Sequence, residues 1–155
     1  MGGVGRAGPH RVSLALRDIP APDFADVSIL LVPGGAPTDP ALWAREIFDI
    51  RRTPVPVRAL MALRQALVPL LGIDRGSQEV FTVREQLGEE VLLGSDEKHL
   101  DFRVGVAVDG EARSVRVTTV VRLHGWRGRL YFAPVSVLHP VIVRSMMRSA
   151  RRRLT

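Results

Sequence analysis

The sequence predicts an α+β domain in which a curved antiparallel sheet wraps around a long C-terminal helix. Apolar residues recur at every second position between about residue 78 and residue 124, which is typical of antiparallel strands with one buried face. Two helical patterns precede this region, at 39–50 and at about 56–71, and one long helical pattern follows it, at about 129–153. The length of 155 residues fits one domain.

The N-terminal part of the chain predicts a tail, two strands and the start of a helix. Residues 1–10 are rich in glycine, so we expect a flexible tail there and a single domain over 11–155. Alternation in 11–16 predicts a first strand, and the apolar run 25–32, which ends at a Pro-Gly-Gly turn, predicts a second strand at a sheet edge. Asp39, directly before a proline, is typical of a helix N-cap.

The strands on either side of residues 109–114 form the clearest predicted hairpin. A four-residue loop within this turn places Asp101 opposite Arg122 and His99 opposite His124, whereas a two-residue loop places His99 opposite Arg122. In both registers the same side chains form one apolar face. These are Leu100, Phe102, Val104, Val106 and Val108 in the first strand and Val115, Val117, Thr119, Val121 and Leu123 in the second.

The polar face of this hairpin carries His99, Asp101 and Arg103, and it has two interpretations. One is a catalytic acid–base pair tuned by Arg122, or a metal site formed by the first two residues with His124. The other is a solvated ladder of cross-strand ion pairs. Because the apolar face opposite must be buried, the polar face points away from the core, so we favour the solvated ladder and expect no metal site.

Composition restricts the classes of function. The net charge of +6 comes almost entirely from arginine, because Lys98 is the only lysine. A GC-rich bacterial genome accounts for such arginine usage; the alternative is a basic interaction module for an anionic membrane, an acidic partner or nucleic acid. Aromatic residues make up 5% of the chain, which leaves few side chains for base stacking. We therefore do not expect nucleic-acid binding.

Further motifs are absent from the sequence. It contains no cysteine for a disulfide and no uninterrupted apolar run of about 18 residues, so we expect a cytoplasmic protein without a transmembrane segment. The GxGxxG pattern at 3–8 lacks the preceding strand of a dinucleotide site. No nucleophile elbow, HExxH or P-loop pattern occurs. We expect no cofactor.

Three stretches carry a resemblance to known proteins. They are VRALMALRQALVPLLGI (57–73), EVLLGSDEKHLDFRV (90–104) and TTVVRLHGWRGRLYFAPVSVLHPVIVRSMMRSARR (118–152). They resemble a bacterial family known as the domain of unknown function 2867, and the order of elements resembles the helix-grip fold of the START/SRPBCC superfamily. The family resemblance implies a fold without an established activity. The superfamily resemblance implies a cavity between the sheet and the last helix that holds an apolar small molecule.

The candidate ligand-binding residues line that expected cavity. They are Phe81, Val83, Phe102, Val104, Thr119 and Val121 from the sheet, with Val137, His139 and Val141 from the last helix. Apolar walls with a few polar groups are typical of small-molecule sites. The leading hypothesis is a non-enzymatic or weakly enzymatic binding protein. The alternative is an enzyme of the cyclase or isomerase type that uses His139 or Thr119 as its polar group.

Overall fold

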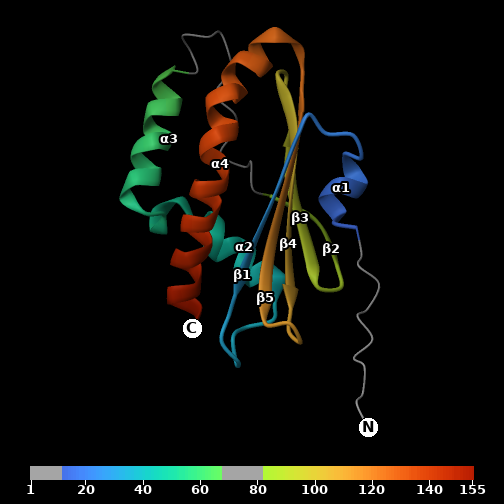
Figure 1. Cartoon of the computed structure of the whole chain (residues 1–155), viewed down its shortest axis with the longest axis vertical. Helices are drawn as coiled ribbons and strands as arrows, with labels where there is room; N and C mark the ends of the chain where they lie inside the picture. Colours follow the sequence, from blue (N-terminus) through green and yellow to red (C-terminus); the bar gives the residue numbers. More distant parts are fainter. Residues whose placement is uncertain (1–11, 68–81) are drawn as a thin grey trace.

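The computed structural model describes residues 12–67 and 82–155, and it shows an antiparallel sheet of five strands with a long C-terminal helix (Figure 1). The elements are α1 (Leu14–Asp18), β1 (Phe24–Leu31), α2 (Pro40–Phe48), the 3-10 helix η1 (Ile50–Arg52), α3 (Val55–Leu67), β2 (Val83–Leu87), β3 (Glu90–Asp96), β4 (Leu100–Asp109), β5 (Ser114–Leu123) and α4 (Gly125–Leu154). The strand order is β1-β5-β4-β3-β2, so β1 and β2 are the edges. The predicted α+β class is confirmed, and the arrangement is helix-grip-like.

Helices cover both faces of the sheet. On one face α4 packs against β1 and β5, and α2 packs against β3, β4 and α4. In Figure 1 α3 lies beside α4 on the side away from the sheet. On the other face the short α1 packs against β3, β4 and β5. The sheet is therefore the middle layer of the domain.

The main core fills the space between the sheet, α2 and one end of α4. Trp43 of α2 and Met147 of α4 are completely buried there, and the Trp43 Nε1 donates a hydrogen bond to the Pro37 carbonyl at 2.7 Å. The strands contribute their alternating apolar residues, Val91, Leu93, Val104, Val106, Val108, Val115 and Val117. This is the face that the period of two predicted to be buried.

The hairpin of β4 and β5 has the register of the four-residue loop. Asp109 pairs with Ser114, and Asp101 therefore lies opposite Arg122. The backbone amide of His124 donates to the carbonyl of His99 at 2.8 Å, which continues the same register past the end of the strands. The two-residue alternative is therefore excluded.

The predicted first strand at 11–16 is wrong, because this segment forms α1. The Ser13 hydroxyl accepts a hydrogen bond from the Ala15 amide at 3.3 Å and so caps the helix. Leu14, Ala15 and Ile19 then bury against the second face of the sheet. A helix of five residues is too short to show a period of 3.6, so its Leu–Ala–Leu spacing resembled a strand.

The other N-terminal elements agree with the sequence. β1 is an edge strand close to the predicted bounds 25–32. α2 begins at Pro40, and the Asp39 carboxylate accepts a hydrogen bond from the Ala41 amide at 3.0 Å. The expected flexible tail, 1–10, and the expected end of the second helix, near residue 71, lie outside the described residues.

α4 differs from the prediction in the residue at which it starts and in being long and apolar enough for a membrane span. It begins at Gly125, before the predicted position 129, and continues through Pro134 and Pro140. By length and composition it is also apolar enough to cross a membrane, which the search for an uninterrupted apolar run did not indicate. Length and composition alone are weak evidence, since a helix packed on its own domain has both. α4 packs on the domain through one side, where Val143 and Met147 are buried against the core, whereas only 22% of its most apolar window is buried.

Candidate functional site

A cavity of about 950 Å³ lies between the sheet and the helices α3 and α4. The sheet wall consists of Leu100, Phe102, Val104, Thr119 and Val121. The α4 wall consists of Tyr131, Phe132, Val135, His139, Ile142, Val143 and Met146. η1, α3 and the adjoining loops complete the lining with Asp49, Ile50, Arg51, Arg58, Met61, Ala62 and Gln65, among others.

The position of the cavity follows from the way the helices cross the hairpin. The inward residues of β4 and β5 near the Asp109–Ser114 turn, such as Val106 and Val117, touch the buried side chains of α2 and α4. Near the start of α4, the same inward face continues with Leu100 and Val121 and borders the cavity. One apolar face of the hairpin thus supplies both the core and the cavity wall.

Several predicted site residues meet around this cavity. Phe102, Val104, Thr119 and Val121 lie on the sheet wall, and His139 lies on the α4 wall. Val83 is half exposed on the edge strand β2 and is not part of the lining. The remaining candidate from the sheet, Phe81, lies outside the described residues.

Val137 and Val141 lie outside the cavity, which corrects the prediction. Their side chains are 74% and 67% exposed, on the outer side of α4. The predicted set took every second residue around His139, but consecutive residues of a helix are turned by about 100°. Positions two residues from His139 therefore face almost the opposite direction.

Helical spacing from His139 identifies three lining residues that are absent from the predicted set. Val135 and Ile142 lie four residues before and three residues after it, and Phe132 lies one turn further back. All three line the cavity. The polar lining residues Asp49 and Arg58 had no comparable signal, because tertiary packing of α2, η1 and α3 brings them to the site.

His139 is the most unusual polar group of the cavity wall. Its Nδ1 lies 3.7 Å from the Asp26 carboxylate oxygen Oδ2, and this nitrogen is buried with no hydrogen-bond partner among the described residues. The ring also packs edge-on against Phe24, with 5.6 Å between centroids. Burial lowers the pKa of His139 below its ordinary value of 6.5, and Asp26 opposes this effect. The imidazole is therefore neutral at pH 7 and can accept a proton.

Asp26 also connects the two polar candidates of the prediction. It lies directly opposite Thr119 in the pairing of β1 with β5, and opposite residues of antiparallel strands have side chains on the same face. Thr119 is buried and lines the cavity. Asp26, which is not itself among the lining residues, thus lies beside Thr119 of the sheet wall and His139 of the α4 wall. The sequence did not identify Asp26, because the register of β1 against β5 was not predictable.

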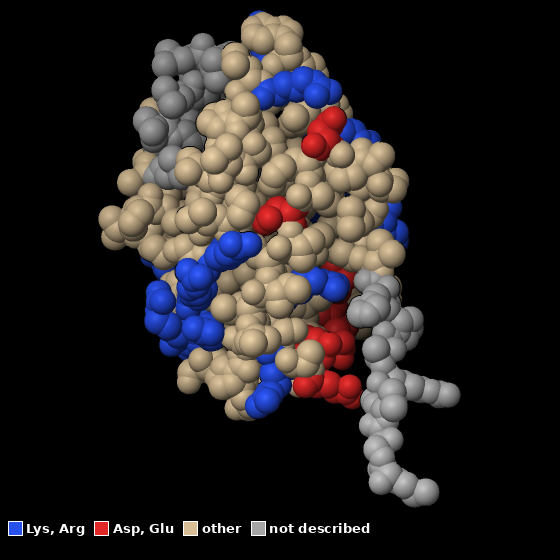
Figure 2. All heavy atoms as spheres, viewed as in Figure 1, with Lys and Arg blue, Asp and Glu red and all other residues tan. Residues whose placement is uncertain are grey.

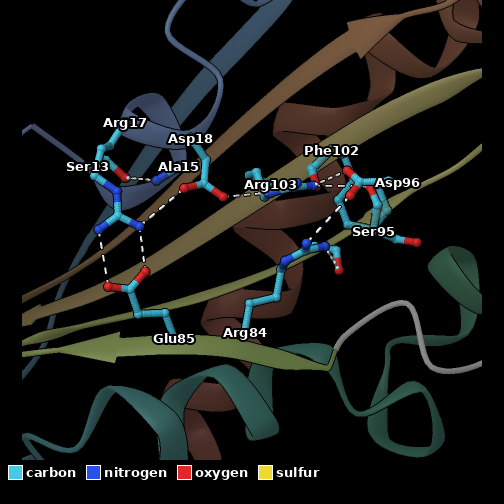
Figure 3. Close-up of polar contacts among 11 residues, drawn as sticks. Ser13, Ala15, Arg17, Asp18, Arg84, Glu85, Ser95, Asp96, Phe102 and Arg103 are labelled. Carbon is cyan, nitrogen blue, oxygen red and sulfur yellow. Dashed lines mark hydrogen bonds and ion pairs between the residues drawn. The ribbon is translucent and has the colours of Figure 1, made fainter.

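The opposite face of the sheet carries an ion-pair network instead of a solvated ladder (Figure 3). Arg103 is only 8% exposed and lies under α1. Its Nε is 3.0 Å from the Asp18 carboxylate, and its terminal nitrogen is 2.8 Å from the Asp96 carboxylate. Hydrogen bonding from Arg103 is the main cause that lowers the pKa of Asp96. The prediction of a solvated Arg103 is therefore wrong, because α1, a helix that the sequence did not predict, covers this face.

Two of the remaining polar residues of that hairpin, His124 and Asp101, are in contact through their side chains. His124 Nε2 lies 3.0 Å from the Asp101 carboxylate, and both side chains are partly exposed. Within residues 12–67 and 82–155, no three His, Cys, Asp or Glu side chains are close enough together to hold a metal ion. The ligand set that included His99 is therefore not assembled, and the cavity on the other face is the candidate site.

The fold and the cavity define a helix-grip-like α+β protein with a candidate site between sheet and helix. The chain belongs to the family described as Protein of unknown function (DUF2867), whose model matches residues 19–146. The resemblance to this family noted in the sequence is confirmed. No curated protein matches the chain, and no solved structure does.

Proposed function

We propose that this protein binds an apolar small molecule in the cavity between the sheet and α4, in the manner of START/SRPBCC-like helix-grip proteins. The cavity itself carries the proposal. Its volume of about 950 Å³ is within the range of small-molecule sites, which is about 300–1,000 Å³. Aromatic and aliphatic side chains such as Phe102, Phe132 and Ile142 form most of its walls.

The charged residues of the lining favour a ligand without net charge. Arg51 and Arg58 contribute positive charge, and Asp49 and Glu97 contribute negative charge. Removal of the apolar walls from water stabilises a bound apolar molecule by about 25 cal/mol per Å² of buried area. His139 and Thr119 supply the few polar groups that orient such a ligand.

Binding is testable with the neutral fluorescent probe N-phenyl-1-naphthylamine. We expect saturable binding with increased probe fluorescence. Val135→Trp places a large side chain in the cavity and is expected to weaken binding at least about tenfold, because it removes space for the probe. The matched control is Val137→Trp, two residues further along α4 on the exposed side, which leaves binding unchanged. Equal loss or no loss in both variants would contradict the proposal.

A second candidate function is proton transfer within the same cavity, and the arrangement of His139 favours it. A neutral, buried imidazole beside an apolar space is suited to act as a general base, and Asp26 is placed to stabilise its protonated form. This function corresponds to the isomerase-type alternative.

The probe for this second function is 5-nitrobenzisoxazole. A base removes its C3 proton, the electrons of that C–H bond form a nitrile, and the N–O bond breaks to give a coloured phenolate. We expect a rate that rises with pH through a pKa below 6.5 and that His139→Gln abolishes, while N-phenyl-1-naphthylamine still binds to the variant. If His139→Gln retains the full rate, His139 is not the base.

A further inference from the structure

The outer face of α4 has an unusual composition. We define it as Trp126, Leu130, Pro134, Val137, Val141, Arg144, Arg148 and Arg152, which follow each other at intervals of three or four residues and are all exposed. Such spacing places them on one stripe of the helix. The first half of the stripe is apolar and includes the 69% exposed Trp126 and the 74% exposed Val137. The second half consists of arginines.

The charge of α4 is entirely positive. The helix contains seven arginines and no acidic residue. These seven positive charges exceed the net charge of +6 of the whole chain. Arg129 and Arg153 pair with Asp23 and Glu46, but Arg144, Arg148 and Arg152 have no carboxylate partner in the described part of the chain. In Figure 2 Lys and Arg side chains gather towards the C-terminal end of α4, below a largely uncharged surface.

We propose that the outer face of α4 docks on the surface of a bilayer that contains anionic phospholipids. The apolar half enters the boundary between headgroups and acyl chains, where exposed valine and leucine side chains leave water. The arginine half lies at the level of the lipid phosphates, which attract it. Arg127, whose guanidinium lies 5.4 Å from the centroid of the Trp126 ring, adds an aromatic and cationic anchor at the start of the helix.

Charge complementarity favours this partner over a second copy of the chain or a nucleic acid. A second copy docked through the same helix brings only arginines and no carboxylate to Arg144, Arg148 and Arg152. Nucleic acid offers phosphates but leaves Val137 and Val141 exposed to water. A helix spanning the bilayer is also disfavoured, because the opposite side of α4, including Met146 and Met147, is buried against the sheet and α2. The surface of an anionic bilayer satisfies both halves of the stripe at once.

Vesicle flotation of the full chain tests this proposal. The probes are vesicles of phosphatidylcholine alone and vesicles with about one third phosphatidylglycerol. We expect flotation with the anionic vesicles and release at high salt, because ions screen the arginines. Replacement of the three arginines of the stripe weakens binding about 100-fold, since each basic residue near such a surface contributes about a factor of five. The variant is Arg144→Gln with Arg148→Gln and Arg152→Gln.

The control variant removes the same amount of charge elsewhere. It combines Lys98→Gln, Arg113→Gln and Arg122→Gln, which are exposed cations outside α4, and it has the same net charge as the test variant. We expect it to float like the unchanged protein. For the apolar half, Val137→Asp weakens binding at least about tenfold, whereas Ile29→Asp, on the exposed edge strand β1, does not.

Several results would overturn the proposal. These are equal flotation with both vesicle types, equal loss in the test and control charge variants, and binding that only detergent reverses, which indicates a spanning helix. Salt-sensitive binding to a DNA duplex that Val137→Asp leaves unchanged, without flotation, assigns the arginines to nucleic acid instead. The vesicle results are independent of the cavity, because the outer face of α4 and the cavity lining share no residue. Val135→Trp, for example, changes a lining residue that lies off the outer face.

Discussion

The buried side chain of Arg103 forms an ion pair with the more exposed Asp18, with 3.0 Å between Nε and Oδ2, although they are 85 positions apart in the sequence. The pair joins α1 to the central strand β4 on the face away from the cavity (Figure 3). A second carboxylate, Asp96, binds the same guanidinium. This network has a structural role, and it leaves the apolar face of the sheet for the cavity.

The first prediction concerns the stability that Arg103 provides. We expect Arg103→Met to lower the free energy of unfolding by about 1–2 kcal/mol, because it removes the buried guanidinium that binds Asp18 and Asp96 and leaves these carboxylates only their exposed partners Arg17 and Arg84. Urea denaturation followed by circular dichroism measures the change. The control Arg122→Met alters an exposed arginine of β5 and changes the free energy by less than about 0.5 kcal/mol. A similar small change for Arg103→Met would show that the network is dispensable.

The second prediction concerns the acid dependence of stability. Hydrogen bonds from Arg103 lower the pKa of Asp96 below 3.8, so the folded state binds fewer protons than the unfolded state near that pH. The contribution of this pair is present above pH 3.8 and is lost as the pH falls through the lowered value. Urea midpoints between pH 2 and pH 6 measure this loss. In Arg103→Met we expect a shallower decline, and a decline as steep as in the unchanged protein argues against the assignment.

A third prediction concerns Gly105, where β4 passes beneath α1. A Cβ at this position would overlap the Glu90 carboxylate and the Ser13 hydroxyl, which are hydrogen-bonded to each other. We therefore expect Gly105→Ala to destabilise the protein by about 1–3 kcal/mol. Gly110→Ala is the control, because the nearest atom to its Cβ is the Thr38 methyl group at 3.4 Å. Thermal unfolding of the two variants compares the sites, and equal melting temperatures would contradict the close packing of α1.

The fourth prediction concerns the titration of His139. Its pKa is lowered by burial, so the unfolded state gains a proton near pH 6.5 while the folded state remains neutral. Stability is therefore expected to decline as the pH falls below 6.5, until the pH reaches the lowered value. Nuclear magnetic resonance of the ring protons gives the pKa directly. Asp26→Asn is expected to lower it further, because Asp26 favours the charged form; an increase would contradict the pairing.

The sequence predicted those elements whose pattern is local. The alternation of β4 and β5 defined their apolar face, and the register followed from a choice between two loop lengths, of which the Asp109–Ser114 pairing is the observed one. The start of α2 followed from Asp39, whose carboxylate caps the helix. These features depend on residues close together in the chain.

The features that the sequence did not predict depend on contacts between distant segments. α1 is too short for a helical period, and only its burial against Leu92 and Val120 defines its place. That unforeseen layer is why Arg103 is buried. On α4 the cavity side was predictable in principle, since helical spacing from His139 excludes Val137 and Val141. Asp26 required the pairing of β1 with β5, which links positions almost a hundred residues apart.

The most direct test of the proposed function is the position of a bound apolar molecule on the protein. The measurement is a set of intermolecular nuclear Overhauser effects between N-phenyl-1-naphthylamine and the methyl groups of the labelled protein. We expect contacts with Val104, Val121 and Ile142, which line the cavity. Contacts restricted to the exposed methyl groups of Val137 and Val141, on the outer face of α4, would show that the probe binds outside the cavity and would contradict the account.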